Sequence, residues 1–273
     1  MTMTHSLEAW IDGIGLLGPG LENWTAAQSI LAGKTAYVAQ PLVVPPPMAL
    51  PPAERRRVGL SVKVALAVAQ EAVNAAQADA KQLAAVFTSS GADGDNCDAI
   101  CQVLASDDRH ISPTRFHNSV HNAPAGYWGI ASGAMKPANV VCAYDASFGA
   151  GLLDAMTQVG GDTAGVLLVA YEAPYPEPLH AKRPHPSAFG LALALMPQRG
   201  PQSLARIRID LVEGVADTLS NAELEALRRQ IPCARGLPLA QLLASGGSAR
   251  VLLEYLAPLV LAVEIEKCIE ACN

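Results

Sequence analysis

Charged residues are scarce in this sequence. They make up 16% of its 273 residues, against about 25% in ordinary soluble domains, whereas hydrophobic residues make up 51%. This balance predicts that a partner covers part of the surface. The formal net charge is −6, and no stripe of basic residues is present that could neutralise phosphate groups. We therefore expect no nucleic-acid partner.

Long apolar runs are also missing. The longest stretch near the C-terminus, residues 251–265, is interrupted by Glu254, Pro258 and Glu264, so it is too short and too charged to span a bilayer. Residues 1–10 lack the basic and apolar pattern of a signal peptide. We expect a cytoplasmic protein without a membrane partner.

Metal-ligating residues are few and poorly spaced. The six cysteines fall at positions 97, 101, 142, 233, 268 and 272, and thiols in a cytosolic chain of this size stay reduced. Cys97 precedes Cys101 by four residues, as Cys268 precedes Cys272, but no histidine or third ligand follows at a metal-like spacing. We predict no metal and no other cofactor.

Segments with strand-like and helix-like patterns alternate along the chain. Short apolar runs predict strands over 9–15, 83–88, 139–144, 165–171, 188–196 and 207–211, with further apolar segments at 249–255 and 259–265. Helices are expected over 23–33, 61–80, 98–105, 118–132, 151–159 and 221–230, whereas six prolines between 41 and 52 exclude a helix there. This alternation indicates an α/β fold with helices on both faces of a sheet.

The turn at residues 145–151 is the main candidate for chemistry. It joins a predicted strand to a predicted helix, where many α/β enzymes expose a nucleophile beside backbone N–H groups. Ser147 with His117 or His121 as its base would give a serine-dependent acyl transferase or thioesterase. The usual Gly-x-Ser-x-Gly elbow is absent, because Asp145 stands two residues before the serine. The alternative is that Ser147 is a turn residue or a helix cap.

His117 and His121 also deserve comparison with a metal pair. They are four residues apart, so a helix through both would place them on one face. No glutamate completes a His-Glu-x-x-His motif. The favoured interpretation is that both histidines border an interface and hydrogen-bond the backbone or a partner.

Several motifs, taken in order, resemble the N-terminal half of β-ketoacyl synthases, which have the thiolase fold. Asn118, Asn122 and the pair Ala125-Gly126 match the pattern of the family's dimer-interface helix. Residues 89–94 resemble its glycine-rich turn, and the strand ending at Glu172 resembles its Gly-x-x-Glu-Ala strand. The resemblance covers residues 8–200. It implies one thiolase-like α/β/α domain over residues 1–273, truncated, in which 201–273 are a short replacement of a largely missing C-terminal half.

Two departures from the family pattern bear on activity. Active members have a cysteine at the elbow, and aligning the following Gly151 with the family places Phe148 at that position, with Ser147 as its neighbour. Active members also have two histidines in C-terminal loops, whereas the last histidine here is His185. His180 and His185 lie in a proline-rich loop, where we expect them to be exposed. The resemblance therefore implies no catalytic residue in this chain.

The resemblance is to short chain-length-factor-like proteins of the aryl polyene type. It implies a subunit that is not an enzyme on its own and that pairs with an active β-ketoacyl-ACP synthase (acyltransferase class) as a heterodimer or heterotetramer. Such a subunit shapes the tunnel in which a polyketide or polyene grows and meets the acyl carrier protein only indirectly. An alternative is a scaffold that binds the acyl carrier protein through Arg55, Arg56 and Arg57, although three such arginines are usually a solvated surface.

The resemblance also suggests residues for these roles. The predicted dimer-interface residues are Phe116, His117, Asn118, His121, Asn122, Tyr127 and Trp128. The candidates that would gate the tunnel lie on the predicted helix near residues 98–105; they are Cys97, Ile100, Cys101 and Leu104. The alternative for these four is that they are ordinary core contacts.

Overall fold

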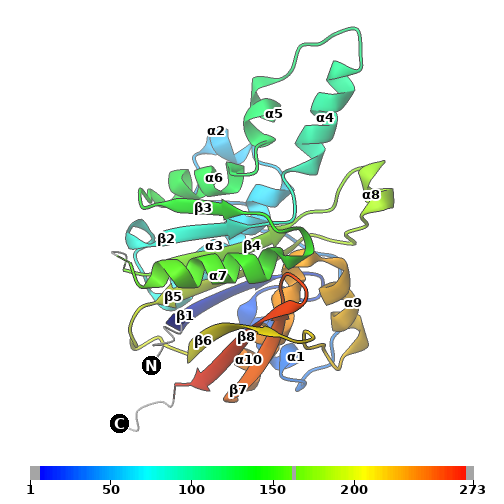
Figure 1. The fold of residues 1–273 in the computed structure, drawn as a ribbon. Helices are drawn as coiled ribbons and strands as arrows, with labels where there is room; N and C mark the ends of the chain where they lie inside the picture. Colours follow the sequence, from blue (N-terminus) through cyan, green and yellow to red (C-terminus); the bar gives the residue numbers. More distant parts are fainter. Residues whose placement is uncertain (1–6, 162–163, 269–273) are drawn as a thin grey trace.

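A mixed β-sheet runs through the residues that the structure, a computed structural model, describes: 7–161 and 164–268. Its strands are β1 (Leu7–Leu17), β2 (Ala84–Thr88), β3 (Ala138–Val141), β4 (Val166–Glu172), β5 (Phe189–Met196), β6 (Ala205–Glu213), β7 (Ala249–Glu254) and β8 (Leu259–Lys267). They lie in the order β3-β2-β4-β5-β1-β6-β8-β7 (Figure 1). β2 pairs in parallel with β3 and β4, and the other pairs are antiparallel.

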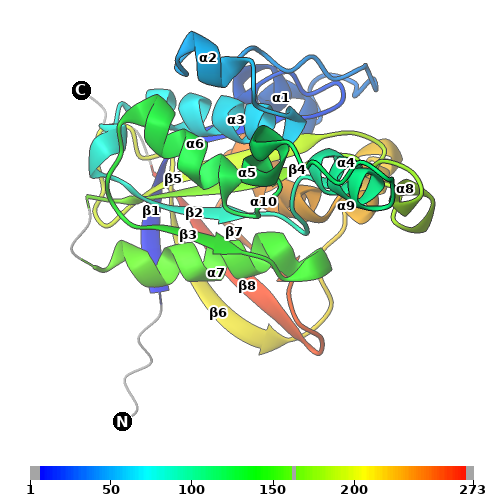
Figure 2. The same cartoon turned by 90° about the horizontal axis from the view of Figure 1, so that it is seen from above.

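Helices cover both faces of this sheet. They are α1 (Trp24–Leu31), α2 (Pro52–Arg55), α3 (Leu60–Ala76), α4 (Gly94–Leu104), α5 (Pro113–Asn118), α6 (Ala123–Ser132), α7 (Ser147–Val159), α8 (Leu179–Lys182), α9 (Ala222–Gln230) and α10 (Leu237–Ser245). Three short 3-10 turns are η1 (Ala80–Gln82), η2 (Tyr144–Ala146) and η3 (Pro232–Gly236). α3 and α6 lie on one side of the sheet and α7 on the other (Figure 2). No helix in the described ranges has both the length and the apolar character that a bilayer crossing requires.

The core has two halves because the strands bury both faces. In β4, Leu168 and Ala170 belong to the hydrophobic cluster that contains the apolar residues of α7. Their neighbours Leu167 and Val169 belong to the cluster that contains the apolar residues of α3. Side chains alternate between the faces of a strand, so a continuous apolar run feeds both halves of the core. The predicted α/β/α layering is confirmed.

Strand β1 is longer than the sequence pattern predicted. The glycines at 13 and 15 suggested a turn, yet the strand continues through them to Leu17. A Cβ on Gly13 would lie 2.0 Å from the Ala72 carbonyl oxygen, and one on Gly15 would lie 2.0 Å from that of Val68. Both glycines therefore allow α3 to pack directly on the strand, a use of glycine that is also typical of strand interiors.

Residues beyond 200 extend the same sheet. β6 pairs with β1, β8 pairs with β6, and β7 forms the outer edge. The strand predicted over 207–211 and the helix predicted over 221–230 are confirmed, and the apolar segments noted at 249–255 and 259–265 form β7 and β8. Asn221 caps that helix by accepting hydrogen bonds from the N–H groups of Glu223 and Leu224.

One predicted helix is wrong. Residues 118–132 do not form a single helix: α5 ends at Asn118 and α6 begins at Ala123. Pro124 lies in the first turn of α6. Proline has no N–H to donate to the preceding turn and its ring clashes there, which favours a new helix beginning at this position over one that continues from residue 118.

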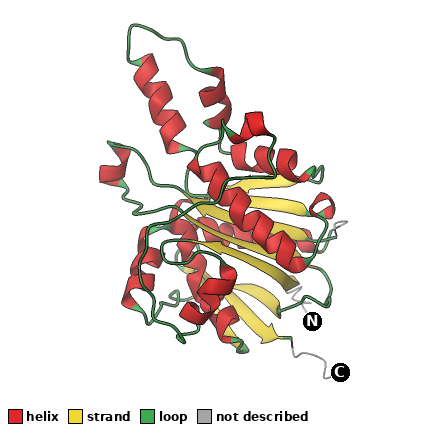
Figure 3. Cartoon of the chain, turned by 180° about the vertical axis from the view of Figure 1, so that it is seen from behind, coloured by secondary structure: helices red, strands yellow, loops and turns green. Residues whose placement is uncertain are grey.

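Helices α4 and α5 and the loop between them, residues 94–118, form an arm that projects from the body of the protein (Figure 3). No side chain of α4 is buried. The arm is held at its base by Asn118, which is buried. The Asn118 amide donates to the Arg57 carbonyl (2.8 Å), and its oxygen accepts from the Tyr127 hydroxyl (2.9 Å).

Candidate functional site

The first turn of α7 holds Ser147 and Phe148. This helix begins at Ser147 and not at Gly151, because the predicted turn is part of the helix itself. The Ser147 hydroxyl is buried; it donates to the Tyr144 carbonyl (2.7 Å) and accepts from the Ala143 N–H (3.1 Å). Both hydrogen bonds stabilise the turn that leads into α7, so the interpretation of Ser147 as a turn residue is confirmed.

Neither predicted base pairs with Ser147. The His117 ring packs edge-on against Tyr127, with ring centroids 5.9 Å apart. His121 lies between α5 and α6, and its Nε2 is 3.3 Å from the Ser89 carbonyl oxygen. The proposed serine–histidine pair is therefore wrong. The break between α5 and α6 is the physical reason, and it also removes the shared helix face predicted for the two histidines.

Phe148 is part of the hydrophobic core and is 1% exposed. Its ring lies directly against η3, since a Cβ added to Gly236 would be 2.5 Å from the ring carbons. The same Cβ would be 2.7 Å from a methyl carbon of Leu191, so only glycine fits between them. A phenyl ring has no lone pair with which to attack a thioester, so no covalent acyl transfer can begin at this position.

A buried polar cluster lies beside this turn, where β2 and β4 end. Glu172 is the last residue of β4, and its Oε1 accepts from the Ser90 N–H (2.6 Å) and the Cys233 thiol (3.6 Å). Its Oε2 lies 3.9 Å from Nδ1 of His185, a buried nitrogen without a hydrogen-bond partner in the described structure. Both Glu172 and His185 are 2% exposed. The prediction that His185 is an exposed loop residue is therefore wrong.

Burial disfavours the charged form of each ionisable side chain in this cluster. It raises the pKa of Glu172 from the ordinary 4.5 to about 7. Burial, with the Arg183 guanidinium as the next cause, lowers the pKa of His185 from 6.5 to about 4. Burial beside the Glu172 carboxylate also raises the pKa of the Cys233 thiol, so this cysteine is not an activated nucleophile.

Charged side chains of alternating sign connect the elements around the same turn, in the order Arg183, Asp145, Arg235, Glu254, Arg228 and Glu225. Asp145 accepts from Arg183 (2.7 Å) and lies 3.2 Å from Arg235. Arg228 is buried and donates to Glu225 and Glu254 at 2.7 Å each. The chain joins η2, η3, β7 and α9, and so holds η3 against Phe148.

The sequence analysis did not foresee either of these groups. Glu172 had a signal, because it ends a buried strand within a motif of the resembling family. Cys233 and Arg235 had none, because they reach this turn only through the packing of η3. Within 7–161 and 164–268, where Cys97 and Cys101 lie, no three His, Cys, Asp or Glu side chains are placed to hold an ion. Cys272 lies outside the described residues.

All four tunnel-gating candidates lie on α4, in the arm. Cys97 and Ile100 are partly exposed, and Cys101 and Leu104 are exposed. The Cys97 thiol donates to the Ser119 carbonyl (3.7 Å) at the base of the arm. The alternative that these residues are core contacts is wrong for this chain, because α4 contributes no buried side chain.

The seven predicted interface residues fall into two groups. Phe116 (64% exposed), His117 and Asn122 lie on the surface, and His121 is half-buried. Asn118, Tyr127 and Trp128 are buried inside the chain, where the two aromatic rings pack in the core beneath α6. Phe116 is therefore the aromatic side chain of this set that is available to a partner.

Comparison with known proteins agrees with the resemblance seen in the sequence. A family model described as β-ketoacyl synthase, N-terminal domain, matches residues 23–252. The match continues past residue 200, where the resemblance seen in the sequence ended. No curated protein matches the sequence.

Three solved complexes contain chains with the same fold. In the ketosynthase ApeO in complex with its chain length factor ApeC, from Xenorhabdus doucetiae, the match is 22% identical and covers 94% of this chain and 99% of that chain, with a TM-score of 0.72. For the ishigamide ketosynthase/chain length factor the match is 14% identical and covers 95% of this chain and 99% of that chain, with a TM-score of 0.71. For AntDE:AntF, a type II PKS acyl-carrier protein in complex with its ketosynthase, the match is 12% identical and covers 96% of this chain and 100% of that chain, with a TM-score of 0.74. The predicted thiolase-like fold is confirmed.

Proposed function

Because the chain belongs to the family of the β-ketoacyl synthase N-terminal domain, we propose that it is a non-catalytic chain-length-factor subunit. It pairs with an active β-ketoacyl-ACP synthase and shapes the tunnel in which the acyl or polyene chain grows. One observation carries this proposal: Phe148, which the family resemblance aligns with the nucleophile position, is a buried phenyl ring, and no histidine within 7–161 and 164–268 hydrogen-bonds into the turn that presents it. Two of the similar solved complexes pair a ketosynthase with a chain length factor.

The chemistry of the complex then belongs to the partner. The thiol that holds the acyl group and the imidazoles that stabilise the enolate come from the active subunit, so acyl transfer describes the pair and not this chain. The acyl carrier protein delivers substrate to the active subunit and meets this chain only indirectly. The cytoplasmic location expected from the sequence remains a prediction.

A free sheet edge supports pairing with a related fold. β3 ends the sheet and bonds only to β2, and its first two residues are exposed. Unpaired edge strands readily accept another strand. Ile130 of α6 and Met135, just before β3, are exposed apolar side chains next to this edge in the chain. A ketosynthase carrying an equivalent edge would cover all of these groups.

The arm supports a role at the tunnel. Cys97, Ile100, Cys101 and Leu104 follow one another at spacings of three, one and three residues, which places them on one side of α4. An apolar stripe on a helix without a buried side chain needs a covering surface, because exposed apolar area is costly in water. We assign this cover to the partner, with Phe116 of α5 as an aromatic contact beside it.

The experiment is reconstitution with an active ketosynthase and its acyl carrier protein. The ketosynthase alone should be poorly active, and adding this chain should give a stable pair that releases a product of defined length. Ile100→Trp should shorten the product, because the indole fills space at the tunnel end. Gln102→Trp is the matched control: Gln102 is exposed on another side of α4 and should leave the product unchanged.

Two results would overturn the proposal. One is product formation by the ketosynthase that is equally fast and of equal length without this chain. The other is acyl-enzyme formation on this chain in the absence of the ketosynthase, detected by intact-mass spectrometry.

The isolated chain should self-associate, since the apolar groups assigned to the partner are then open to water.

A further inference from the structure

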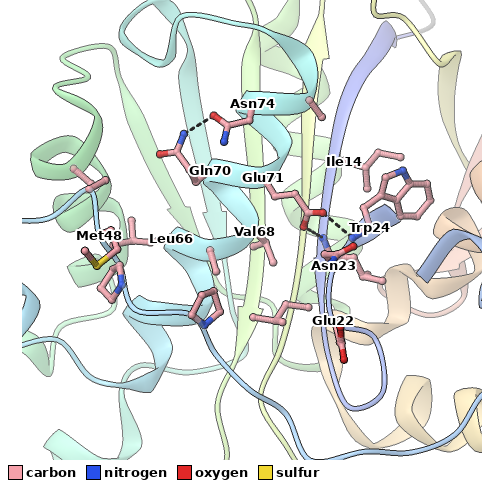
Figure 4. Close-up of a pocket in the computed structure, with 18 of the residues that line it drawn as sticks. Ile14, Glu22, Asn23, Trp24, Met48, Leu66, Val68, Gln70, Glu71 and Asn74 are labelled. Carbon is pink, nitrogen blue, oxygen red and sulfur yellow. Dashed lines mark hydrogen bonds between the residues drawn. The ribbon is translucent and has the colours of Figure 1, made fainter. Parts of the chain in front are cut away.

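A cavity of about 760 Å³ opens on the side of the sheet that α3 covers (Figure 4). Its lining comes from α3, the corner between β1 and α1, the proline-rich segment 45–49, and Trp128 and Ala131 of α6, and includes no residue of α7 or the arm. Its volume is in the range of pockets that bind small molecules, about 300–1,000 Å³. The role proposed above makes no use of it.

The wall of the cavity is apolar and rigid. Three consecutive prolines, Pro45–Pro47, form one side; proline fixes its backbone and has no N–H to present. The end of this segment is fixed by Arg55, whose guanidinium donates to the carbonyls of Met48 (3.3 Å) and Leu50 (3.0 Å). The cavity is therefore formed in advance of any ligand, which reduces the cost of binding.

The rest of the lining favours a molecule with rings. Trp24 and Trp128, two of the three tryptophans in the sequence, contribute to it together with Met48. Aromatic faces, proline rings and a thioether all pack well against a flat apolar ring system. Ala67 and Ala75 of α3 add small side chains that leave room above the helix.

The charge of the lining selects against anions. Its ionisable side chains are two carboxylates, Glu22 and Glu71, and no lysine, arginine or histidine is among the lining residues, all of which are described. Glu71 points toward Trp24 in Figure 4, and its oxygens accept from the N–H groups of Leu16 (2.9 Å) and Trp24 (2.7 Å). A ligand carboxylate, sulfonate or phosphate would meet like charge without a basic partner.

We infer that this cavity binds a neutral or cationic aromatic amine, with its rings against the prolines and the exposed Met48 and its N–H groups directed to the carboxylates. Trp24 and Trp128, which are 7% and 3% exposed, reach the ligand only with the edges of their rings. The acceptor-rich rim suits a hydrogen-bond donor, and the apolar wall suits the ring body. The inference does not use Phe148 or α4, on which the proposed subunit role rests, although α6 contributes Trp128 and Ala131 to the cavity next to the Ile130 that is assigned to the partner.

The test compares two probes that share one ring system. 1-Aminoanthracene carries the amine, and anthracene-1-carboxylate carries an anion at the same position. With the full-length chain, 1-aminoanthracene should bind saturably with one site per chain, followed by probe fluorescence and by energy transfer from the tryptophans. Anthracene-1-carboxylate should bind at least tenfold more weakly than 1-aminoanthracene. Glu22→Gln should reduce this difference in affinity between the two probes because Glu22 is exposed on the rim.

A substitution that fills the cavity distinguishes probe binding in the cavity from probe binding to other apolar surfaces. Ala67→Phe should reduce binding of 1-aminoanthracene at least tenfold. Ala222→Phe, the same substitution at an exposed position of α9, should leave it unchanged. Absence of saturable binding, equal binding of the two probes, or equal binding by Ala67→Phe and Ala222→Phe would each overturn the inference. Circular dichroism spectra matching the unsubstituted chain establish that both variants are folded.

Discussion

The pair formed by Glu172 and His185 should make the stability of two variants depend on pH in opposite directions. Burial raises the pKa of Glu172 from 4.5 to about 7 and lowers that of His185 from 6.5 to about 4. Between pH 4.5 and 6.5 both side chains are charged in the unfolded chain and neutral in the folded one. In this range folding takes a proton from the imidazole and adds one to the carboxyl, so no net proton is bound. The unfolding free energy of the unsubstituted protein therefore does not change with pH on account of this pair.

Each single variant removes one side of this balance. In Glu172→Gln only His185 remains, whose lowered pKa contributes stability that is present above pH 6.5 and is lost as the pH falls toward 4. In His185→Gln only Glu172 remains, whose raised pKa contributes stability that is present below pH 4.5 and is lost as the pH rises through 7. A pKa difference of about 2.5 corresponds to about 3 kcal/mol for each group.

The assay is urea unfolding at pH 4.5, 5.5 and 6.5, with the unfolding free energy of each variant taken relative to the unsubstituted protein at the same pH. Taking this difference cancels the pH dependence that the other carboxylates contribute equally to the unfolding free energy of every variant. Glu172→Gln should gain about 2 kcal/mol in relative stability as the pH rises from 4.5 to 6.5, His185→Gln should lose about as much, and the double variant should show no slope. Slopes of the same sign in the two single variants would refute the reasoning, as would no slope in either.

Three further results are expected around the first turn of α7. Phe148→Ala should lower the unfolding free energy by about 3–5 kcal/mol in urea titrations because it leaves a core cavity, and Phe148→Cys should give no acyl-enzyme by mass spectrometry with acyl-ACP. Arg228→Met should cost about 3 kcal/mol because the partly buried Glu225 loses its counter-charge and Glu254 keeps only Arg235, whereas the exposed Arg229→Met should change the unfolding free energy by less than about 0.5 kcal/mol. Ser147→Ala should lower stability by about 1–2 kcal/mol and leave the activity of the reconstituted pair unchanged; loss of that activity in a folded variant would contradict a purely structural hydroxyl.

Much of the fold could be predicted because each strand has a strong local signal. β4 and β5 are uninterrupted apolar runs, and such runs fit only a sheet covered on both faces. The start of α9 was equally clear, since Asn221 stands before an amphipathic segment and caps it. Once the resemblance placed Phe148 at the nucleophile position, its lack of acyl-transfer chemistry followed from residue identity, because phenylalanine cannot serve as a nucleophile in any conformation.

The remaining features depend on contacts between distant parts of the chain. Glu172, His185 and Cys233 meet because β4, the loop before β5 and η3 converge, and no periodicity within one segment encodes that. The break between α5 and α6 was missed for a different reason: the spacing of apolar residues continues through it, and proline at the start of a helix is compatible with either interpretation. Burial of Tyr127 and Trp128 was hidden in the same way, because a small-residue-rich helix gives little indication of which face packs inward.

The arm has a consequence for how such a protein can diversify. Substitutions on α4 change no buried contact of the chain, so most of them alter stability by about 0.5 kcal/mol or less. Under the proposed role, the same positions decide how far a product can extend. New product lengths can therefore arise by drift in one short helix while the sheet and both core clusters stay under constant selection for folding.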